Sequence, residues 1–209
     1  MCAERSKTAF LYGQVRRGLQ SGIYMPGQRI DPVELAAQFN ISITPARFAM
    51  QRLVIEGLIS DHARGGMRVP LPNEMALREL YDWMHLLLQI ACDLLKTRRP
   101  AGSLMPIVAT AKNDPVKLTW KLFNAIAVAS GHRRLHKNVK QTNDCLASIR
   151  RAKQHMIGDI HEELADLLRY WHRCDIRRLE SALATYHERR KQLVPDIVSA
   201  LHVQAERLP

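Results

Sequence analysis

The sequence predicts a mainly α protein with two parts, and three observations support this fold class. Apolar residues recur at helical spacing along most of the 209 residues. One stretch, residues 58–70, instead combines two short apolar runs with a glycine-rich turn and predicts a two-stranded hairpin. The proline-flanked segment 70–73 then separates the first third from a remainder without strand-like alternation. We therefore expect a first domain over 1–70, a linker over 71–73 and an all-helical second domain over 74–209.

Three helices are expected before the hairpin, over residues 10–21, 32–39 and 45–56. The last two begin with a residue that can cap a helix, followed by a proline, which suits the first helical position. In the third helix Thr44 is the expected cap and Pro45 the first residue. The apolar residues of this helix recur at three- and four-residue spacing, so one face is expected to be buried. They are Ala46, Ala49, Met50, Leu53 and Val54.

The hairpin is expected to join the strands LIS and MRVP through the basic turn DHARGG, and residues 28–30 can add a short strand. Helix, helix, turn, helix and hairpin in this order predict a winged helix-turn-helix. Such a unit places its third helix in the DNA major groove and its hairpin tip beside the backbone or the minor groove. Arg47 lies off the apolar face of the third helix, and Arg64 lies in the turn. An ordinary amphipathic helix with a solvated hairpin would expose the same arginines, and the order of elements favours DNA binding.

The second part is expected to form a helix bundle, which begins with a long helix over 74–97. Pro195 is expected to kink or split the last helix. The basic stretches 149–153 and 187–191 are interpreted as solvated helix surfaces. A bundle of this kind can hold a ligand in its interior, and it can equally serve only as a platform for dimerisation. The remaining helices are expected near 106–113, 115–130, 132–155, 158–173 and 175–207.

Composition narrows the class of protein. Hydrophobic residues make up 46% and charged residues 24%, which is typical of a globular chain, and no apolar run approaches the roughly 20 residues of a membrane span. Neither a signal peptide nor a CxxC pair is present among the scattered cysteines, so we expect a reducing, cytoplasmic and nucleoid-associated location. The net charge of +11 favours a polyanion, an acidic membrane surface or small acidic ligands as partners, but the positive charge is spread over both parts.

The segments YGQVRRGLQSGIYMPGQRI, ELAAQFNIS, TPARFAMQRLVIEGLI and GGMRVP resemble the winged helix-turn-helix of GntR-family transcription regulators. The resemblance covers most of residues 8–70. The helical remainder, with ASGHRRL near its middle, resembles the FCD effector domain of one GntR subgroup over most of 74–209. The resemblance implies a homodimeric repressor or activator that binds a palindromic operator. It also implies that a small metabolite, often an organic acid, enters the helical domain and changes DNA binding.

The same resemblance implies which residues contact DNA. Hydroxyl groups at the start of the third helix are expected at phosphates, and Arg47 at a guanine edge. Family members usually carry arginine where Ile43 stands, glutamate where Phe48 stands and often arginine where Glu34 stands, so we expect altered base recognition. The expected DNA-binding residues are Ser42, Thr44, Arg47, Gln51, Arg52, His62, Arg64, Gly65, Gly66 and Arg68.

Many FCD domains bind a divalent metal through an aspartate, a histidine four residues later and two further histidines. The aligned positions here hold Thr119, Phe123, Leu164 and Tyr186, which are expected to form an apolar pocket with two hydroxyls. We therefore expect no metal and no other cofactor, and either an organic acid or a more apolar, aromatic effector.

The sequence departs from the known motifs of enzymes. HEELADLLRYWH departs from the zinc-protease pattern HExxH at Ala165, and no phosphate-binding loop or nucleophile motif is present, so we expect no enzyme. His132 and His136 lie four residues apart and can share a metal, but a solvated basic helix face explains them more simply. The second open hypothesis is an effector-blind architectural protein that binds DNA through charge and dimerises through the bundle.

Overall fold

The computed structural model describes residues 2–62, 66–98, 106–107 and 114–208. Contacts divide the chain into two compact units, one of Met1–Leu71 with Ser199–Pro209 and one of Pro72–Val198. Residues 199–209 thus belong by their contacts to the first unit, although the sequence analysis grouped them with the helical domain. Among the described residues, no helix is both long and apolar enough to cross a bilayer.

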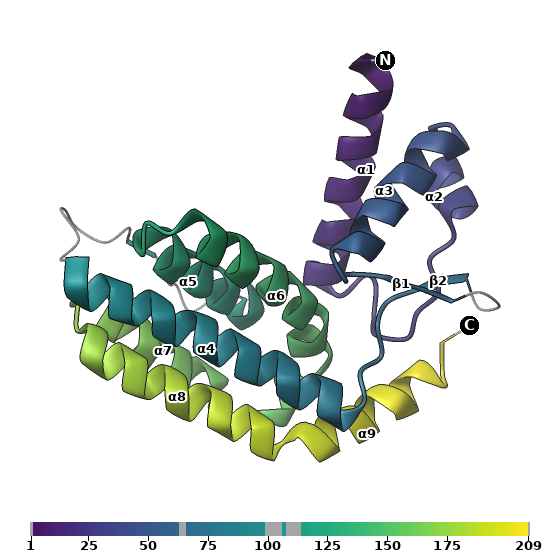
Figure 1. The fold of residues 1–209 in the computed structure, drawn as a ribbon. Helices are drawn as coiled ribbons and strands as arrows, with labels where there is room; N and C mark the ends of the chain where they lie inside the picture. The colour runs from purple at the N-terminus through teal and green to yellow at the C-terminus, as the bar shows by residue number, and fades with distance from the viewer. Residues whose placement is uncertain (1, 63–65, 99–105, 108–113, 209) are drawn as a thin grey trace. The chain divides into compact units, whose positions relative to one another are not determined.

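Within the described residues, the first unit contains three whole helices, the end of a fourth and a two-stranded antiparallel sheet (Figure 1). Its core forms around Leu11, Ala36, Ala46 and Ala49, because α1 and α2 both pack against the apolar face of α3. The elements are α1 (Cys2–Ser21), α2 (Pro32–Gln38), α3 (Ile43–Ile55), β1 (Ser60–His62) and β2 (Gly66–Arg68). The expected winged helix-turn-helix is therefore confirmed, and α1 begins eight residues earlier than the expected Phe10.

The start of α3 differs from the prediction. Ser42 occupies the capping position and Ile43 begins the helix, so Thr44 is not the cap and Pro45 is the third helical residue. The first four amides of a helix lack partners within it, so a proline in the third position removes no hydrogen bond. The expected order does hold for α2, where Asp31 Oδ1 accepts a hydrogen bond from Val33 N at 2.7 Å and Pro32 follows.

The end of α3 explains the sharp turn into the hairpin. Gly57 has φ of +72°, and a Cβ added to it would meet no atom within 4 Å. Its backbone conformation, and not a lack of space, therefore favours glycine. The hairpin pairs Ser60 with Arg68 and His62 with Gly66, and residues 27–30 extend it through a single bridge between Arg29 and Arg68.

The second unit is an all-helical bundle in its described part (Figure 1). Helix α4 packs against α5, α6 and α8, and α7 packs against α5 and α8. The apolar side of α4, from Leu77 to Leu95, is buried along its length. The elements are α4 (Glu74–Arg98), α5 (Pro115–Ala129), α6 (Arg133–Ala152), the 3₁₀ turn η1 (Gln154–Met156), α7 (Ile160–His172), α8 (Ile176–Gln192) and α9 (Val194–Ala205).

Two expected helices need correction. The single helix expected over 175–207 is split at Leu193 into α8 and α9, with Pro195 as the second residue of α9, so the predicted effect of this proline is confirmed. Of the helix expected over 106–113, residues 106–107 are not helical and 108–113 lie outside the described residues.

Candidate DNA-binding surface and a buried basic cluster

The outer face of α3 is the candidate DNA-binding surface. Thr44, Phe48, Gln51 and Ile55 follow one another at spacings of three and four residues, and all four are exposed. The opposite face, which includes Met50, is buried in the core of the first unit. The surface is therefore held on a packed scaffold, as recognition of DNA bases requires.

The beginning of α3 carries two of the expected phosphate ligands. Ser42 and Thr44 are exposed, and the Ser42 side chain makes no capping hydrogen bond. The unpaired amides of the first turn also favour an anion at this end of the helix. Both hydroxyls can therefore bind DNA phosphates without breaking an interaction within the protein.

The two arginines of α3 differ in what they contact. Arg52 donates through Nε to Glu56 Oε1 at 3.1 Å, and its guanidinium lies 4.0 Å from the centroid of the Tyr12 ring. The Tyr12 hydroxyl donates to Glu56 Oε2 at 2.5 Å, and burial together with this bond raises the pKa of Tyr12 to about 12. Among the described residues none accepts a hydrogen bond from the exposed Arg47. Arg47 is thus available to a partner, whereas Arg52 supports the scaffold.

The hairpin presents further basic groups. Arg68 is exposed and donates through Nη1 to Gly27 O at 3.1 Å, and Gly66 has φ of +66°, a conformation that favours glycine. His62 lies in β1 and its Nε2 is 3.0 Å from Ser60 Oγ. Arg64 and Gly65, both expected DNA contacts, lie outside the described residues.

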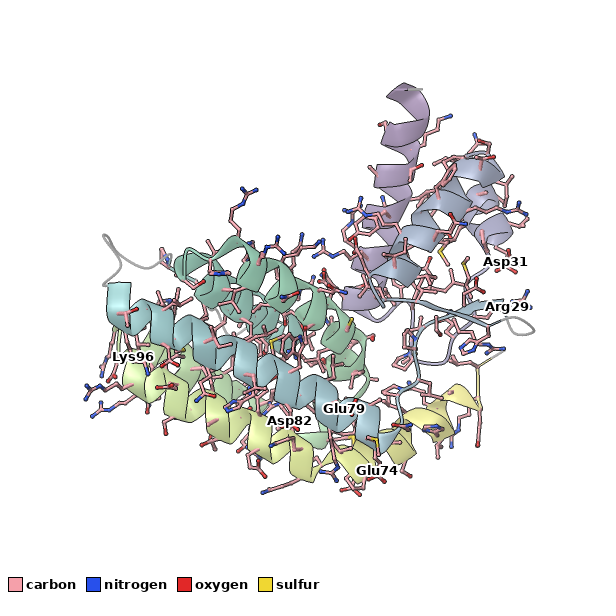
Figure 2. The ribbon with its side chains drawn as sticks, in the orientation of Figure 1. Arg29, Asp31, Glu74, Glu79, Asp82 and Lys96 are labelled. Carbon is pink, nitrogen blue, oxygen red and sulfur yellow. The ribbon has the colours of Figure 1, made fainter. Side chains whose placement is uncertain are left out.

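Arg29 is a further basic residue beside the hairpin and is not among the DNA-binding residues expected from the sequence. This residue bridges to Arg68, its side chain is 59% exposed, and its Nη2 lies 3.5 Å from Asp31 Oδ2 (Figure 2). The motif GQRI places it directly before α2, but sequence alone does not show that residues 27–30 lie along the hairpin. Arg29 and Arg68 thus place two basic groups on one edge of the sheet.

The four positions of the expected effector pocket lie in the core of the second unit. Phe123 packs edge-on against Tyr186 with ring centroids 5.4 Å apart, and Leu164 is also buried. Thr119 Oγ1 donates to Pro115 O at 2.8 Å. Thr119 and Tyr186 line one small cavity of about 10 Å³, with room for about one water molecule.

Three of the other side chains around this cavity are basic, and they lie beside the apolar Val116, Ile157 and Ile160. Arg150, Lys153 and Arg190 line it and are 4%, 3% and 1% exposed. The basic stretches of α6 and α8 are therefore not simply solvated surfaces. Arg150 of α6 and Lys153, which caps its C-terminus, continue the buried stripe that passes through Leu146. Charged residues that continue an apolar stripe are the signal that could have revealed them.

Two of the three cations have partners inside the protein. Arg190 binds the Glu163 carboxylate through both terminal nitrogens, at 2.8 and 2.5 Å, and its guanidinium stacks 3.3 Å from the Tyr186 ring centroid. Lys153 Nζ contacts the Tyr81 hydroxyl. Burial, and then the nearby Arg190 and Arg150, hold the pKa of Lys153 well below its usual range.

Arg150 is only partly satisfied. Its Nη1 donates to Asn143 Oδ1 at 2.6 Å, but Nε and Nη2 are buried and have no hydrogen-bond partner among the described residues. A buried donor without a partner is costly, and a buried cation without a counter-ion more so. Among the acidic residues that the structure describes, Glu163 is the one that pairs directly with this cluster. The cluster, defined as Arg150, Lys153 and Arg190, is therefore complementary to an added anion.

His132 and His136, the pair that could share a metal by their spacing, make other contacts. His132 Nδ1 caps α6 by accepting from Leu135 N at 3.2 Å, and His136 Nε2 lies 2.9 Å from Asn124 Oδ1. His161 is exposed, whereas His187 is buried with Nδ1 2.7 Å from Leu183 O. In the part of the chain that the structure describes, no three metal-binding side chains come together.

Comparison with known proteins assigns the first unit to a family. The model of bacterial regulatory proteins of the gntR family matches residues 7–69. An uncharacterized HTH-type transcriptional regulator, YdhC of Bacillus subtilis, is 31% identical over 147 residues, which cover 65% of this chain and 66% of the relative. The Nta operon transcriptional regulator of Aminobacter aminovorans is 39% identical over 71 residues, 34% of each chain. The alignments thus span just under two thirds and about one third of these relatives.

Solved structures share the fold over both units. The E. coli protein McbR/YncC is 20% identical with a TM-score of 0.68, over 91% of this chain and 97% of that one. A transcriptional regulator described as GntR from Rhodococcus sp. RHA1 is 15% identical with a TM-score of 0.71, over 91% and 98%.

A winged helix-turn-helix with an exposed arginine on α3 is a fold that binds DNA, and here a helical bundle follows it. The match over residues 7–69 shows that the first unit is a gntR-type DNA-binding domain.

Proposed function

We propose that this regulator binds a palindromic operator as a homodimer and that a small organic acid, bound at the basic cluster of the helical unit, changes its affinity for DNA. The observation that carries the effector is the buried Arg150 guanidinium, two nitrogens of which have no partner among the described residues. The functional division is a DNA-binding domain over 1–70, a linker over 71–73 and an effector domain over 74–209, whose residues 199–209 group by their contacts with the first unit. A cytoplasmic, nucleoid-associated location follows from this function.

DNA recognition is assigned to α3 and the hairpin. With α3 in the major groove, Arg47 donates to a guanine edge, and the Ser42 and Thr44 hydroxyls bind phosphates at the positive end of the helix. Arg29 and Arg68 bind the backbone beside the hairpin. Because Arg52 is bound to Glu56 and lies over the ring of Tyr12 in α1, its contribution is to hold α3 against α1.

Dimerisation is assigned to α4. Trp83, Leu86 and Ile90 form one stripe of this helix and are 47%, 48% and 48% exposed. A palindromic operator presents the same half-site twice, so a two-fold interface between copies matches it. We therefore assign this stripe to contact with a second copy of the chain.

The chemistry of the cluster favours a carboxylate effector. Arginine can bind a carboxylate through two hydrogen bonds, and burial strengthens them. The cavity is too small for any organic acid, so binding must move side chains of α6 or α8. A ligand that prefers the widened arrangement shifts the population towards it, which gives the effector a route to altered DNA binding.

The test compares the affinity for operator DNA with that for scrambled DNA, and it measures how carboxylates change the affinity for the operator. Fluorescence anisotropy would measure binding to the chain's own upstream DNA and to a scrambled duplex at two salt concentrations. We expect at least about 10³-fold tighter binding to the operator, maintained at higher salt. Small carboxylates, with their neutral amides as controls, are expected to change operator affinity in the wild type and not in Arg150→Met.

Two results would contradict this proposal. Equal and steeply salt-dependent binding to both duplexes would favour the architectural protein that binds through charge alone. Specific DNA binding that no carboxylate alters would refute the proposed carboxylate effector and would leave the proposed operator binding intact.

A further inference from the structure

Phe48 is the most unusual side chain on the candidate DNA-binding surface. It is 57% exposed and lies on the outer face of α3, with Thr44 four residues before it and Gln51 three residues after it. The partly buried apolar side chains that pack against the core of this unit are Tyr12, Phe39, Ile41 and Ile43. Phe48 instead belongs to the surface that faces away from this core.

An exposed phenyl ring between polar neighbours has few uses on a helix that enters the major groove. The edges of three of the four bases offer only hydrogen-bond donors and acceptors there, whereas thymine adds a methyl group at C5. Apolar side chains recognise thymine through this methyl, because both surfaces leave water on contact. Neighbouring Arg47 and Gln51 carry the donors that suit adjacent bases, so the three side chains together match a mixed sequence.

We propose that Phe48 contacts the C5 methyl group of a thymine in each operator half-site and makes this base a determinant of specificity. The inference rests on the proposed placement of α3 in the major groove. It assigns a role to the position at which this chain departs from the glutamate of the resembled family. A 5-methylcytosine at the same position would present the same methyl group.

The test removes the methyl group from the DNA and the ring from the protein. A duplex pool of random sequence would first be enriched with the wild-type full-length chain. In the recovered duplex, each thymine would then be replaced in turn by deoxyuridine, which lacks only the C5 methyl. Anisotropy would measure the affinity of each duplex.

At one position of each half-site, we expect removal of the methyl group to lower wild-type affinity by roughly fourfold. This factor corresponds to the loss of about 0.8 kcal/mol for one buried carbon group. Replacement of the other thymines should have little effect. Phe48→Ala should bind the thymine duplex more weakly and should bind the thymine and deoxyuridine duplexes equally.

Two variants serve as matched controls. Ile55→Ala truncates another exposed apolar residue of the same face, 83% exposed, and should retain the fourfold preference for thymine. Arg47→Ala should weaken binding to both duplexes and should retain the ratio between them. Far-UV circular dichroism and the thermal midpoint would show that each variant is folded, and Phe48→Leu, with an apolar but smaller side chain, should keep part of the preference.

The outcomes separate this inference from the proposed function. Sequence-specific binding that is unaffected by every deoxyuridine, or a thymine preference that survives in Phe48→Ala, would overturn the inference and leave the regulator intact. Failure to enrich any sequence would overturn both. If Phe48→Ala changes self-association instead of the thymine preference, the ring contacts another protein and not DNA.

Discussion

The guanidinium of Arg190 and the carboxylate of Glu163 form a two-bonded ion pair between α8 and α7, and their side chains are only 1% and 14% exposed. Pairs of this kind are costly to break, because the remaining partner is left as a buried, uncompensated charge. The pair between Arg190 and Glu163 therefore holds one side of the basic cluster in place.

Glu163→Gln should lower the free energy of unfolding by about 3–5 kcal/mol, because it leaves Arg190 without its counter-ion. Urea denaturation measures this change. A second substitution, Arg190→Met, should restore much of the lost stability. Asp159→Asn, which affects the solvent-exposed pair with Arg189, is the matched control and should change stability little. A loss as large in the control would show that the buried position is not the cause.

Arg150→Met should leave the free energy of unfolding unchanged or raise it by about 1–4 kcal/mol, since it replaces a partly satisfied buried cation by an apolar side chain of similar length. The same variant should lose the rise in thermal midpoint that carboxylates give the wild type. Differential scanning fluorimetry with and without ligand measures both effects. Wild-type stabilisation that persists in the variant would place the ligand elsewhere.

His187 makes stability depend on pH below neutrality. Burial is the main cause that holds its pKa well below 6.5, so the unfolded chain takes up a proton here that the folded chain does not. More protons in the unfolded state mean that stability falls as pH drops below about 6.5, by up to about 1.4 kcal/mol per pH unit from this group. His187→Gln should remove that part of the slope in urea titrations between pH 7 and 5. The same slope in His187→Gln as in the exposed control His161→Gln would refute this.

Arg47→Ala and Arg52→Ala should have different effects, although the two residues lie five positions apart on one helix. Arg47→Ala should weaken binding to the operator by about 1–3 kcal/mol and leave the fold intact. Arg52→Ala, which loses contacts with Glu56 and Tyr12, should lower the thermal midpoint slightly and retain the preference for operator over scrambled DNA. Anisotropy and thermal denaturation of both variants provide the check, and equal loss of specificity in the two would contradict the assignment.

Leu86→Glu on α4 should convert a dimer into a monomer, because it places a charge in the centre of the proposed apolar interface. Sedimentation velocity at several protein concentrations measures the change. Val128→Glu on α5, where the valine is 46% exposed, is the control and should remain dimeric. A wild-type chain that is monomeric at all concentrations would remove the interface.

The sequence was sufficient for the architecture, because helical spacing, Gly57 and Pro195 act locally. The start of α3 was misplaced by two residues because Ser42 and Thr44 are equally able to cap, and a proline tolerates several positions of the first turn. Local sequence patterns do not show which helices pack against one another.

The basic cluster shows this limit most clearly. Arg150 and Arg190 lie forty positions apart in sequences that look like solvated faces, and only the packing of the bundle makes them neighbours of one cavity. The contacts of Arg52 are partly local, because Glu56 lies one turn away at the end of the same helix. The hydrogen bond from Tyr12 of α1 to Glu56 depends on how α1 packs against α3, which local sequence patterns do not show.

Helix α9 has a consequence for how such proteins can be recombined. Its residues from Ser199 onward belong to the same compact unit as the winged helix, and a Cβ added at Gly27 would come within 2.7 Å of Ala205 Cβ. The helical unit, residues 72–198, thus lies in the sequence between two segments of the DNA-binding unit, residues 1–71 and 199–209. A chimera cut only at the linker would carry the winged helix without its last packing segment, so exchange of either module requires two junctions, one of them within a helix.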